Sequence, residues 1–367
     1  MDFPQTDDYR ALFLNSTPLM DVRAPVEFQQ GAFPYTENLP LMNDAERHDV
    51  GIRYKQRGQD EAVQRGHELV QGEVKQQRVD RWADYFRQHP DGVLYCFRGG
   101  LRSKISQQWI YERTGLVYPR VKGGYKAMRR FLIDELETSI NRIEPVILSG
   151  QTGAGKTRLL QKLPNMLDLE GLYHHRGSVF GNHVTPQPTQ IDIENALSIA
   201  LIKAIDRGHT RLLLEDESAN IGHRHLPQSL HARMQHAPII LLEADLAERI
   251  ELIFQEYITD DLSRYQSVHG ESQGFQQWSQ KLSDSIDKIQ RRLGGVRHKQ
   301  LKTLLDNALQ QHEAGNPEGH RDWIEILLVE YYDPMYTHQI NNKQKRIIFH
   351  GGESDVLEFL KTRYQIV

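Results

Sequence analysis

The chain has 367 residues, of which 38% are hydrophobic and 26% are charged, and its net charge is −4. This balance is typical of a globular protein and excludes a disordered chain and a uniformly basic nucleic-acid binder. Because one hydrophobic core seldom serves more than about 300 residues, we expect two domains.

No apolar run approaches the ~20 residues that a membrane span requires. Residues 1–8 are acidic and lack the basic and apolar blocks of a signal peptide. We therefore expect a cytoplasmic protein with no membrane partner.

The first part of the chain predicts an α/β domain. Residues 18–23 predict a strand that ends in a charged loop, and residues 93–96 predict a buried strand with Cys96 at its tip. Residues 44–80, between these strands, are rich in Gln, Arg, Glu and Lys and predict mostly exposed helices. Another helix is expected to begin near Ser103, after the cysteine.

Cys96 is the only cysteine in the sequence, so no intramolecular disulfide stabilises the fold. A thiol is nucleophilic as the thiolate, which nearby cations and a helix N-terminus stabilise. Arg98 and Arg102 supply the cations, while Gly99 and Gly100 let backbone N–H groups turn toward an anion. A buried structural cysteine is the commoner alternative for a lone thiol. We predict that Cys96 is catalytic and that these four neighbours bind an anionic donor.

Two stretches of the chain are basic and contain no acidic residue, namely residues 113–131 and 288–302. Local basic faces on an acidic body are typical of a polyanion site. Solvated helix faces give the same pattern, and charge alone favours that interpretation.

The second part of the chain predicts another α/β domain with a parallel sheet. A helix over residues 126–142 leads into it, and residues 246–315 predict a polar helical insertion. The expected strands are residues 145–149, 211–215, 239–242 and 324–329. The predicted organisation is a first domain over residues 1–130, a helical connector over 131–144 and a second domain over 145–367.

Residues 150–157, Gly-Gln-Thr-Gly-Ala-Gly-Lys-Thr, match the phosphate-binding pattern G-x-x-x-x-G-K-[ST]. The loop follows a predicted strand and precedes a predicted helix at residues 158–163, which is the context that this motif requires. The Lys156 ammonium would neutralise a terminal phosphate, and the Thr157 hydroxyl would ligate Mg²⁺. The residues expected to bind a diphosphate are Gly150, Gln151, Thr152, Gly153, Ala154, Gly155, Lys156 and Thr157.

A carboxylate at the tip of a second strand usually completes such a magnesium site. Glu215, Asp216 and Glu217 follow one another at the end of a predicted strand. Asp216 is preferred by its position, so we predict Thr157 and Asp216 as the metal ligands. The alternative is that these acids only end a strand and begin a turn.

The first domain resembles the rhodanese superfamily. Residues 21–28, Asp-Val-Arg-Ala-Pro-Val-Glu-Phe, are similar to its upstream signature. We expect Asp21, Arg23 and Glu27 to form a supporting cluster of ion pairs near the cysteine loop.

The spacing of the cysteine loop departs from that of sulfurtransferase rhodaneses. Arg102 follows Cys96 by six positions, whereas those enzymes generally place the closing arginine at the fifth position. The longer spacing is shared with rhodanese-like phosphatases, which usually carry His where this chain has Tyr95. The loop is therefore expected to accept a phosphate-like donor such as selenophosphate.

The ordered pair of motifs resembles the bacterial tRNA 2-selenouridine synthase family over nearly the whole chain. The resemblance implies a rhodanese-like α/β domain, then a P-loop NTPase-like parallel α/β domain with a helical insertion. It also implies a transferase that replaces sulfur by selenium in wobble 2-thiouridine of tRNAs for Lys, Glu and Gln. Selenophosphate would be the selenium donor, and S-geranyl-2-thiouridine, made from geranyl diphosphate, would be the intermediate.

The same resemblance implies Mg²⁺ as a cofactor and an enzyme that supplies selenophosphate as a partner. Both basic runs would contact the tRNA backbone. The side chains expected to do so are Arg120, Lys122, Lys126, Arg129, Arg130, Arg291 and Arg292.

Two other functions stay open at the level of sequence. One is a rhodanese-like phosphatase fused to a P-loop small-molecule kinase. The other is a non-catalytic module that carries tRNA or sulfur. The sequence also leaves open whether Cys96 carries a perselenide and whether the P-loop binds geranyl diphosphate or a nucleotide.

Overall fold

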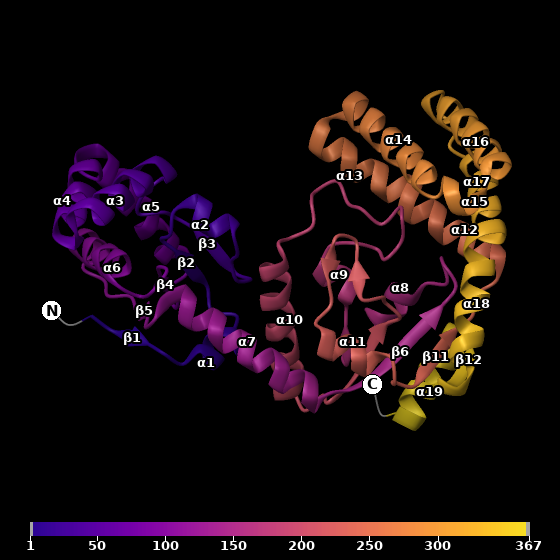
Figure 1. Cartoon of the computed structure of the whole chain (residues 1–367), viewed down its shortest axis with the longest axis horizontal. Helices are drawn as coiled ribbons and strands as arrows, with labels where there is room; N and C mark the ends of the chain where they lie inside the picture. Colours follow the sequence, from indigo (N-terminus) through magenta and orange to yellow (C-terminus); the bar gives the residue numbers. More distant parts are fainter. Residues whose placement is uncertain (1–2, 365–367) are drawn as a thin grey trace. The chain divides into compact units, whose positions relative to one another are not determined.

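The computed structural model describes residues 3–364, which form two compact units (Figure 1). The first unit comprises the chain up to residue 141 together with residues 189–206, and the second comprises residues 142–188 and the chain from residue 207 onward. Residues 131–141 of the predicted connector therefore belong to the first unit. Residues 190–206, which the sequence places in the predicted second domain, also pack in the first unit.

The first unit is built on a parallel five-stranded sheet in the order β1-β5-β4-β2-β3. Its strands are β1 (Gln5–Thr6), β2 (Leu19–Asp21), β3 (Thr36–Asn38), β4 (Val93–Tyr95) and β5 (Arg120–Val121). Its helices are α1 (Tyr9–Leu14), α2 (Pro25–Gln29), α3 (Asp44–Arg57), α4 (Gln59–Leu69), α5 (Gly72–Gln88), α6 (Leu101–Thr114), α7 (Gly124–Arg142) and α10 (Gln190–Asp206).

The strand order of this sheet reverses between β2 and β4. β3 lies on one side of β2, whereas β4 and β5 extend the sheet on the other side. In open parallel sheets, ligands bind outside the carboxyl ends of the strands at such a reversal. Asp21 and Tyr95, the last residues of β2 and β4, are paired in register. The fold thus brings the cysteine loop and the acidic signature to one edge of the sheet.

Helix α10 completes the core of the first unit, although 47 residues separate it from the end of α7. Its Ile199 and Ile202 are buried against Phe13 and Leu132. The Ser198 hydroxyl donates a buried hydrogen bond of 2.8 Å to the carbonyl oxygen of Leu132. Because each fully buried Ile contributes about 1.5–3 kcal/mol, apolar burial explains why this helix packs with the first unit.

The loop that carries Cys96 rests on the N-terminus of α7. The backbone N–H groups of Tyr125 and Lys126 donate to the carbonyl oxygens of Cys96 and Phe97 over 2.9 and 3.0 Å. Gly124 has φ +59°, and a Cβ there would overlap the Cys96 carbonyl oxygen. Only glycine allows two backbones to approach so closely.

The second unit contains another parallel five-stranded sheet, in the order β12-β11-β6-β8-β7. Its strands are β6 (Glu144–Gly150), β7 (Met166–Leu167), β8 (Arg211–Glu215), β11 (Ile239–Leu242) and β12 (Ile347–Gly351), and a separate antiparallel pair is formed by β9 (Asn220–Ile221) and β10 (Arg224–His225). Short helices α8 (Lys156–Leu160), α9 (Leu169–Tyr173), α11 (Gln228–Met234) and α19 (Glu353–Phe359) accompany the sheet. The phosphate-binding loop follows the central strand, β6.

A layer of helices forms the rest of the second unit, as Figure 1 shows for α13, α14 and α16. It confirms the predicted helical insertion and extends it to residue 343. Its helices are α12 (Leu246–Ile253), α13 (Asp260–His269), α14 (Glu271–Lys288), α15 (Gln290–Leu293), α16 (Gly295–Glu313), α17 (His320–Leu327) and α18 (Asp333–Lys343), with π-helical turns η1 (Phe254–Thr259) and η2 (Leu328–Tyr332). The chain ends with the 3₁₀ turn η3 (Gln344–Arg346), β12, α19 and the π-helical turn η4 (Leu360–Tyr364).

The strand predicted at residues 324–329 is wrong, because this segment forms α17 and begins η2. Trp323, Ile324, Leu327 and Leu328 are buried, which is the helical spacing of an apolar stripe. The described sheet instead includes β12 as the edge strand next to β11.

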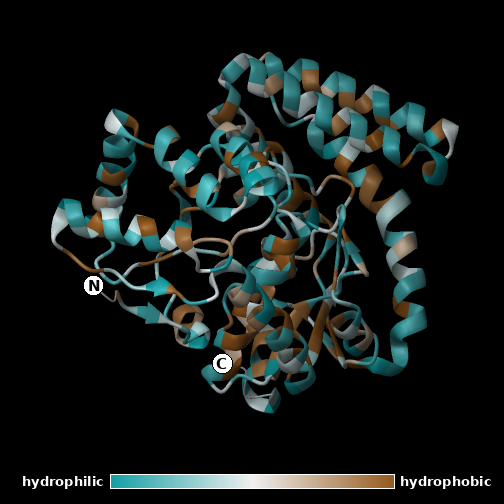
Figure 2. Cartoon of the chain, turned by 60° about the vertical axis from the view of Figure 1, so that its left-hand side comes forward, coloured by the Kyte–Doolittle hydropathy of each residue, from teal (hydrophilic) through white to brown (hydrophobic). Residues whose placement is uncertain are grey.

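Hydrophobic residues concentrate on the central strands, whereas the outer helices alternate hydrophilic and hydrophobic positions (Figure 2). Within residues 3–364, no helix is both long enough and apolar enough to cross a membrane.

We predict that Gly124→Ala lowers the free energy of unfolding by about 3 kcal/mol or more, since backbone overlap adds to the ~1–2 kcal/mol cost of a left-handed L-residue. Gly115→Ala is the matched control, because Gly115 also has positive φ (+71°) but no described atom lies within 4 Å of its Cβ position. Urea unfolding followed by fluorescence measures both variants. Equal losses would show that the close approach to Cys96 is not a constraint.

Candidate active site

The Cys96 thiol lies between the end of β4 and the start of α6. Only 3% of the residue is exposed, yet it borders a cavity in the first unit. Its Sγ donates to the Ser103 hydroxyl oxygen over 3.3 Å, and that hydroxyl donates to the Gly100 carbonyl oxygen over 3.0 Å. Helix α6 begins at Leu101, two positions before the predicted start. The sulfur is therefore excluded from bulk solvent but faces a space that a ligand can enter.

The two glycines of the loop differ in what they allow. Gly99 has φ +64°, and a Cβ there would lie 2.6 Å from the backbone nitrogen of Gly123. At Gly100, by contrast, no described atom lies within 4 Å of the Cβ position, and Gly100 lines the cavity. Gly99 is thus required by packing, whereas Gly100 keeps the backbone open to a ligand.

Arg102 is held at the cavity by Glu27 through two hydrogen bonds, of 2.6 and 3.1 Å. Burial acts to raise the pKa of Glu27, but the hydrogen bonds and charge of Arg102 outweigh it, and the pKa is lowered. Burial acts to lower the pKa of Arg102, but Glu27 likewise outweighs it and raises that pKa. Arg102 therefore stays charged and oriented, while Arg98 is exposed at the cavity rim.

The predicted ion-pair cluster is divided into two parts. Asp21 and Arg23 form a buried pair at 2.6 Å, and Arg23 also donates to the Gly31 carbonyl oxygen over 2.8 Å. Burial raises the pKa of Asp21 despite this partner. Glu27 pairs with Arg102 instead of Arg23, because α2 turns its side chain toward α6. The buried pair supports the fold, and Glu27 serves the site.

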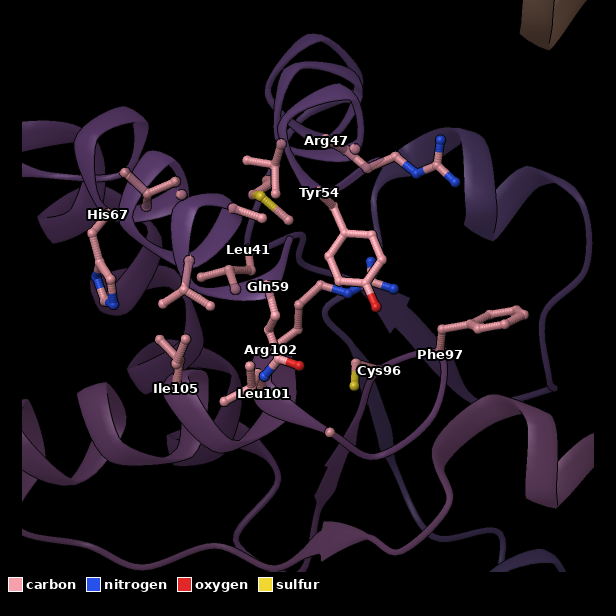
Figure 3. Close-up of a pocket in the computed structure, with 18 of the residues that line it drawn as sticks. Leu41, Arg47, Tyr54, Gln59, His67, Cys96, Phe97, Leu101, Arg102 and Ile105 are labelled. Carbon is pink, nitrogen blue, oxygen red and sulfur yellow. The ribbon is translucent and has the colours of Figure 1, made fainter. Parts of the chain in front are cut away.

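The cavity beside Cys96 has a volume of about 810 Å³. Its wall comes from α3, α4, α6 and the cysteine loop, so the polar stretch 44–80 has a functional inner face. Figure 3 shows Tyr54, Gln59 and Arg102 among the side chains that surround it. Our sequence analysis missed this cavity, and the only signal was the few apolar positions, such as Val50 and Val63, in an otherwise polar segment.

The phosphate-binding loop of the second unit has the expected context, with β6 before it and α8 after it. Helix α8 begins at Lys156, earlier than predicted, and ends at Leu160. Gly153 and Gly155 have φ of +81° and +83°. The Lys156 Nζ donates to the Gly150 and Gln151 carbonyl oxygens over 2.8 and 3.2 Å. The Lys156 Nζ thus lies over the loop, where it could donate to the oxygens of a bound phosphate.

A buried arginine holds this loop from the helical layer. The Arg249 Nε donates to the Thr152 carbonyl oxygen over 2.9 Å, and the guanidinium forms two bonds with Asp333, of 3.0 and 2.5 Å. Only 2% of Arg249 is exposed. The sequence offered no signal for this contact, since it joins three distant segments.

The three candidate acids for a metal lie in different surroundings. Glu215 is buried and accepts from the Leu169 N–H over 2.9 Å. Asp216 accepts from the Ser149 hydroxyl and the Lys343 ammonium, each over 2.7 Å. Its role as a metal ligand stays a prediction, and that role would require Lys343 to move.

Glu217, the third candidate, lies beside Glu170, a carboxyl group near Thr157 that the sequence analysis did not single out. The Thr157 hydroxyl donates to Glu170 over 3.3 Å. Glu217 lies so close to Glu170 that the charge of Glu170 raises the pKa of Glu217. Burial, followed by the charge of Glu170, raises the pKa of Glu217 to about 8. Burial also lowers the pKa of Lys156, although the nearby carboxylates oppose that shift. The two neighbouring carboxyl groups and the threonine hydroxyl supply the oxygen ligands that a divalent cation such as Mg²⁺ prefers.

Among residues 3–364, no group of three or more His, Cys, Asp and Glu side chains could hold a metal ion. Mg²⁺ commonly takes one or two carboxylates and completes its shell with water and substrate phosphates. The residues therefore fit Mg²⁺ that arrives with a diphosphate, and do not form a closed metal cage.

The basic residues predicted to bind tRNA differ in whether other groups of the protein already bind their side chains. Arg120 donates to the Gly99 carbonyl oxygen over 2.7 Å, and Arg129 is paired with Glu194 and Asn195. These two arginines hold the first unit together. The other five predicted side chains are exposed: Lys122, Lys126, Arg130, Arg291 and Arg292. Two of them form ion pairs, Lys122 with Asp7 and Arg130 with Asp134 in the same helix.

Comparison with known proteins identifies the family. The family model described as the tRNA 2-selenouridine synthase AAA domain matches residues 143–366. The tRNA 2-selenouridine synthase of Marinobacter nauticus is 53% identical over 98% of each chain. That of Bordetella petrii is 51% identical over 97% of this chain and 96% of its own, and that of a Sulfurovum species is 47% identical over 98% and 99%.

The chain belongs to the tRNA 2-selenouridine synthase family. This membership confirms the predicted family and the prediction that the chain is an enzyme. The parallel sheets of both units confirm the predicted α/β class. The matched family model covers residues 143–366, so the rhodanese-like character of the first domain stays a prediction.

For this tRNA 2-selenouridine synthase family member, we predict that the melting temperature of the ligand-free protein falls as pH rises from 6 to 9. An unfolded Glu titrates near about 4.3, whereas Glu217 holds its proton up to about 8 in the folded state. A raised pKa contributes stability at low pH that is lost as pH rises through the folded value. Differential scanning calorimetry should show a smaller fall in Glu217→Gln and an unchanged fall in the exposed control Glu313→Gln. An identical fall in all three proteins would contradict the assignment.

Proposed function

We propose that this chain makes 2-selenouridine in tRNA through two reactions at two anion sites, one in each unit. The observation that carries the proposal is the pairing of sites on one chain. Cys96 and Arg102 border one cavity, and the other unit has a complete phosphate-binding loop with Lys156 over it. Family membership supports the overall reaction, and the division into steps is our proposal.

In the first reaction, the sulfur of 2-thiouridine attacks the first carbon of geranyl diphosphate, and the carbon–oxygen bond to diphosphate breaks. The loop N–H groups and Lys156 stabilise the negative charge that develops on the leaving diphosphate. This use of the P-loop requires no hydrolysis of a nucleotide. When bound, Mg²⁺ held by Thr157 with Glu170 or Asp216 would neutralise further diphosphate charge.

In the second reaction, selenium from selenophosphate attacks C2 of S-geranyl-2-thiouridine, and the C2–S bond breaks. Water then cleaves the P–Se bond, so the products are 2-selenouridine, geranylthiol and phosphate. Arg98, Arg102 and the N–H groups at Gly99 and Gly100 are suited to hold the phosphate part of the donor. Cys96 acts in this selenium step, because its sulfur borders the same cavity as Arg98 and Arg102.

We extend the proposal to wobble 2-thiouridine in the tRNAs for Lys, Glu and Gln, with a selenophosphate-producing enzyme as partner. Exposed basic side chains are the ones available to RNA phosphates. Lys126, Arg291 and Arg292 meet that condition best.

We predict that Lys156→Ala lowers geranylation about 100-fold or more, because one charge-stabilising group at a leaving anion is worth about 10²–10³ in rate. It should still install selenium in tRNA that already carries S-geranyl-2-thiouridine. Cys96→Ala should geranylate normally and install no selenium. Nucleoside mass spectrometry of treated tRNA measures both products.

Lys162→Ala is the control for loss of a lysine in the same unit, since Lys162 is exposed and pairs with Glu353. It should retain both reactions. Loss of both reactions in either Lys156→Ala or Cys96→Ala would contradict the division of labour. Hydrolysis of an aryl phosphate through Cys96 without any effect of tRNA would favour the phosphatase alternative.

A further inference from the structure

The cavity beside Cys96 is larger than its thiol and anion site require. Its volume of about 810 Å³ lies in the range of about 300–1,000 Å³ that holds drug-sized ligands. A phosphate-like donor would occupy only the part lined by Arg98, Gly100 and Arg102. The remaining space is bordered mainly by apolar side chains, which a phosphate does not need: Leu41, Met42, Val50, Val63, Val70 and Ile105.

The arginine that would bind an anion lies at the thiol end of the cavity, whereas apolar side chains continue beyond it. Figure 3 shows Tyr54 and Arg102 near Cys96, with Leu41 and Ile105 farther from the sulfur. Such a cavity fits an amphiphile whose reacting polar end lies at the thiol and whose apolar body extends away from it.

The helices that roof the cavity leave apolar surface uncovered. None of the described residues of α3 is buried, and α4 buries only Ala62 within its described residues. Ile52, Tyr54 and Leu101 are 42%, 57% and 42% exposed, and all three line the cavity. Contiguous exposed apolar surface of this kind marks a binding site. A ligand with an apolar body would cover it.

The pocket next to the phosphate-binding loop is much smaller than the cavity at Cys96. An apolar pocket next to Thr152 has a volume of about 20 Å³ and is lined by Phe180, Tyr257, Trp323 and Tyr332, among others. That volume is little more than the ~10–15 Å³ that one water molecule needs. Of these two pockets, only the one at Cys96 is large enough to receive a ten-carbon chain without opening.

We propose that the cavity at Cys96 binds the geranyl chain of S-geranyl-2-thiouridine during the selenium step, with the sulfur at the Cys96 end. This inference rests on the proposed function, since it names the substrate group that the selenium site recognises. Burial of the chain selects alkylated tRNA over unmodified 2-thiouridine, because transfer free energy grows with the number of buried methylene groups. It also aligns the C2–S bond with the donor held by Arg102.

The first test compares anticodon stem-loops that carry S-geranyl-2-thiouridine or S-methyl-2-thiouridine, each supplied with selenophosphate. The wild type should install selenium at least tenfold faster, as kcat/KM, in the geranyl substrate. Val63→Phe fills the cavity from α4 and should reduce that preference at least tenfold. Val74→Phe is the control, because Val74 is also a partly exposed valine in a helix of the first unit but does not line the cavity; it should keep the wild-type preference.

The second test does not depend on turnover. An anticodon stem-loop with a diazirine at the end of the S-geranyl chain is photolysed with the wild-type protein, and the labelled peptides are mapped. Labels within residues 41–70 or 101–109 support the proposal. Labels near Phe180 or Trp323, or no label in the first unit, overturn it.

The two tests also separate failure of this inference from failure of the proposed function. If the wild type installs selenium equally well in both substrates, the function stands and the geranyl site is wrong. If it installs selenium in neither substrate, the proposed selenium step is wrong, and the peptide map alone then supports or overturns the cavity as a prenyl site.

Discussion

The close approach of two backbones beneath Cys96 is the constraint on which the first site depends. The N-terminus of α7 donates two N–H groups to the carbonyl oxygens of Cys96 and Phe97, and Gly124 leaves no room for a side chain there. Because those carbonyl groups face α7, the opposite side of the loop is left for the thiol and a bound anion. Arg102, in the first turn of α6, then reaches the cavity in the orientation that Glu27 sets.

Charge is arranged differently at the two sites. At the Cys96 site, Arg102 forms an ion pair with Glu27. Arg102 therefore stays charged and still has N–H donors for a ligand. At the P-loop, several acids surround Lys156, and burial keeps protons on some of them. The first arrangement suits an anion that arrives alone, and the second suits a diphosphate that arrives with a cation. The two sites therefore favour different anionic substrates, as the two proposed reactions require.

Local patterns in the sequence predicted the places of the two loops but less of what surrounds them. The loop of residues 150–157 was predictable because adjacent residues make it, and so was the cysteine loop. The pairing of Glu27 with Arg102 was not, because it depends on how α2 and α6 pack. Residues 324–329 alternate apolar and polar positions at first, which favoured a strand, yet burial of Trp323 and Leu327 on one helical face decided the outcome. The basic run at 113–131 contains no acid, but folding brings Asp80, Asp7 and Glu194 to it.

The sequence by itself determined the two anion loops, the order of the domains and the family, since each depends on residues that are neighbours along the chain. Only the tertiary structure decided that α10 packs with the first unit, that Glu170 and Glu217 lie near Thr157, and that α3 and α4 enclose a large apolar cavity beside the thiol. The physical reason is that these features arise from contacts between distant segments. Such contacts depend on total apolar burial and on the paths of several elements, and neither quantity is encoded in a short stretch of residues.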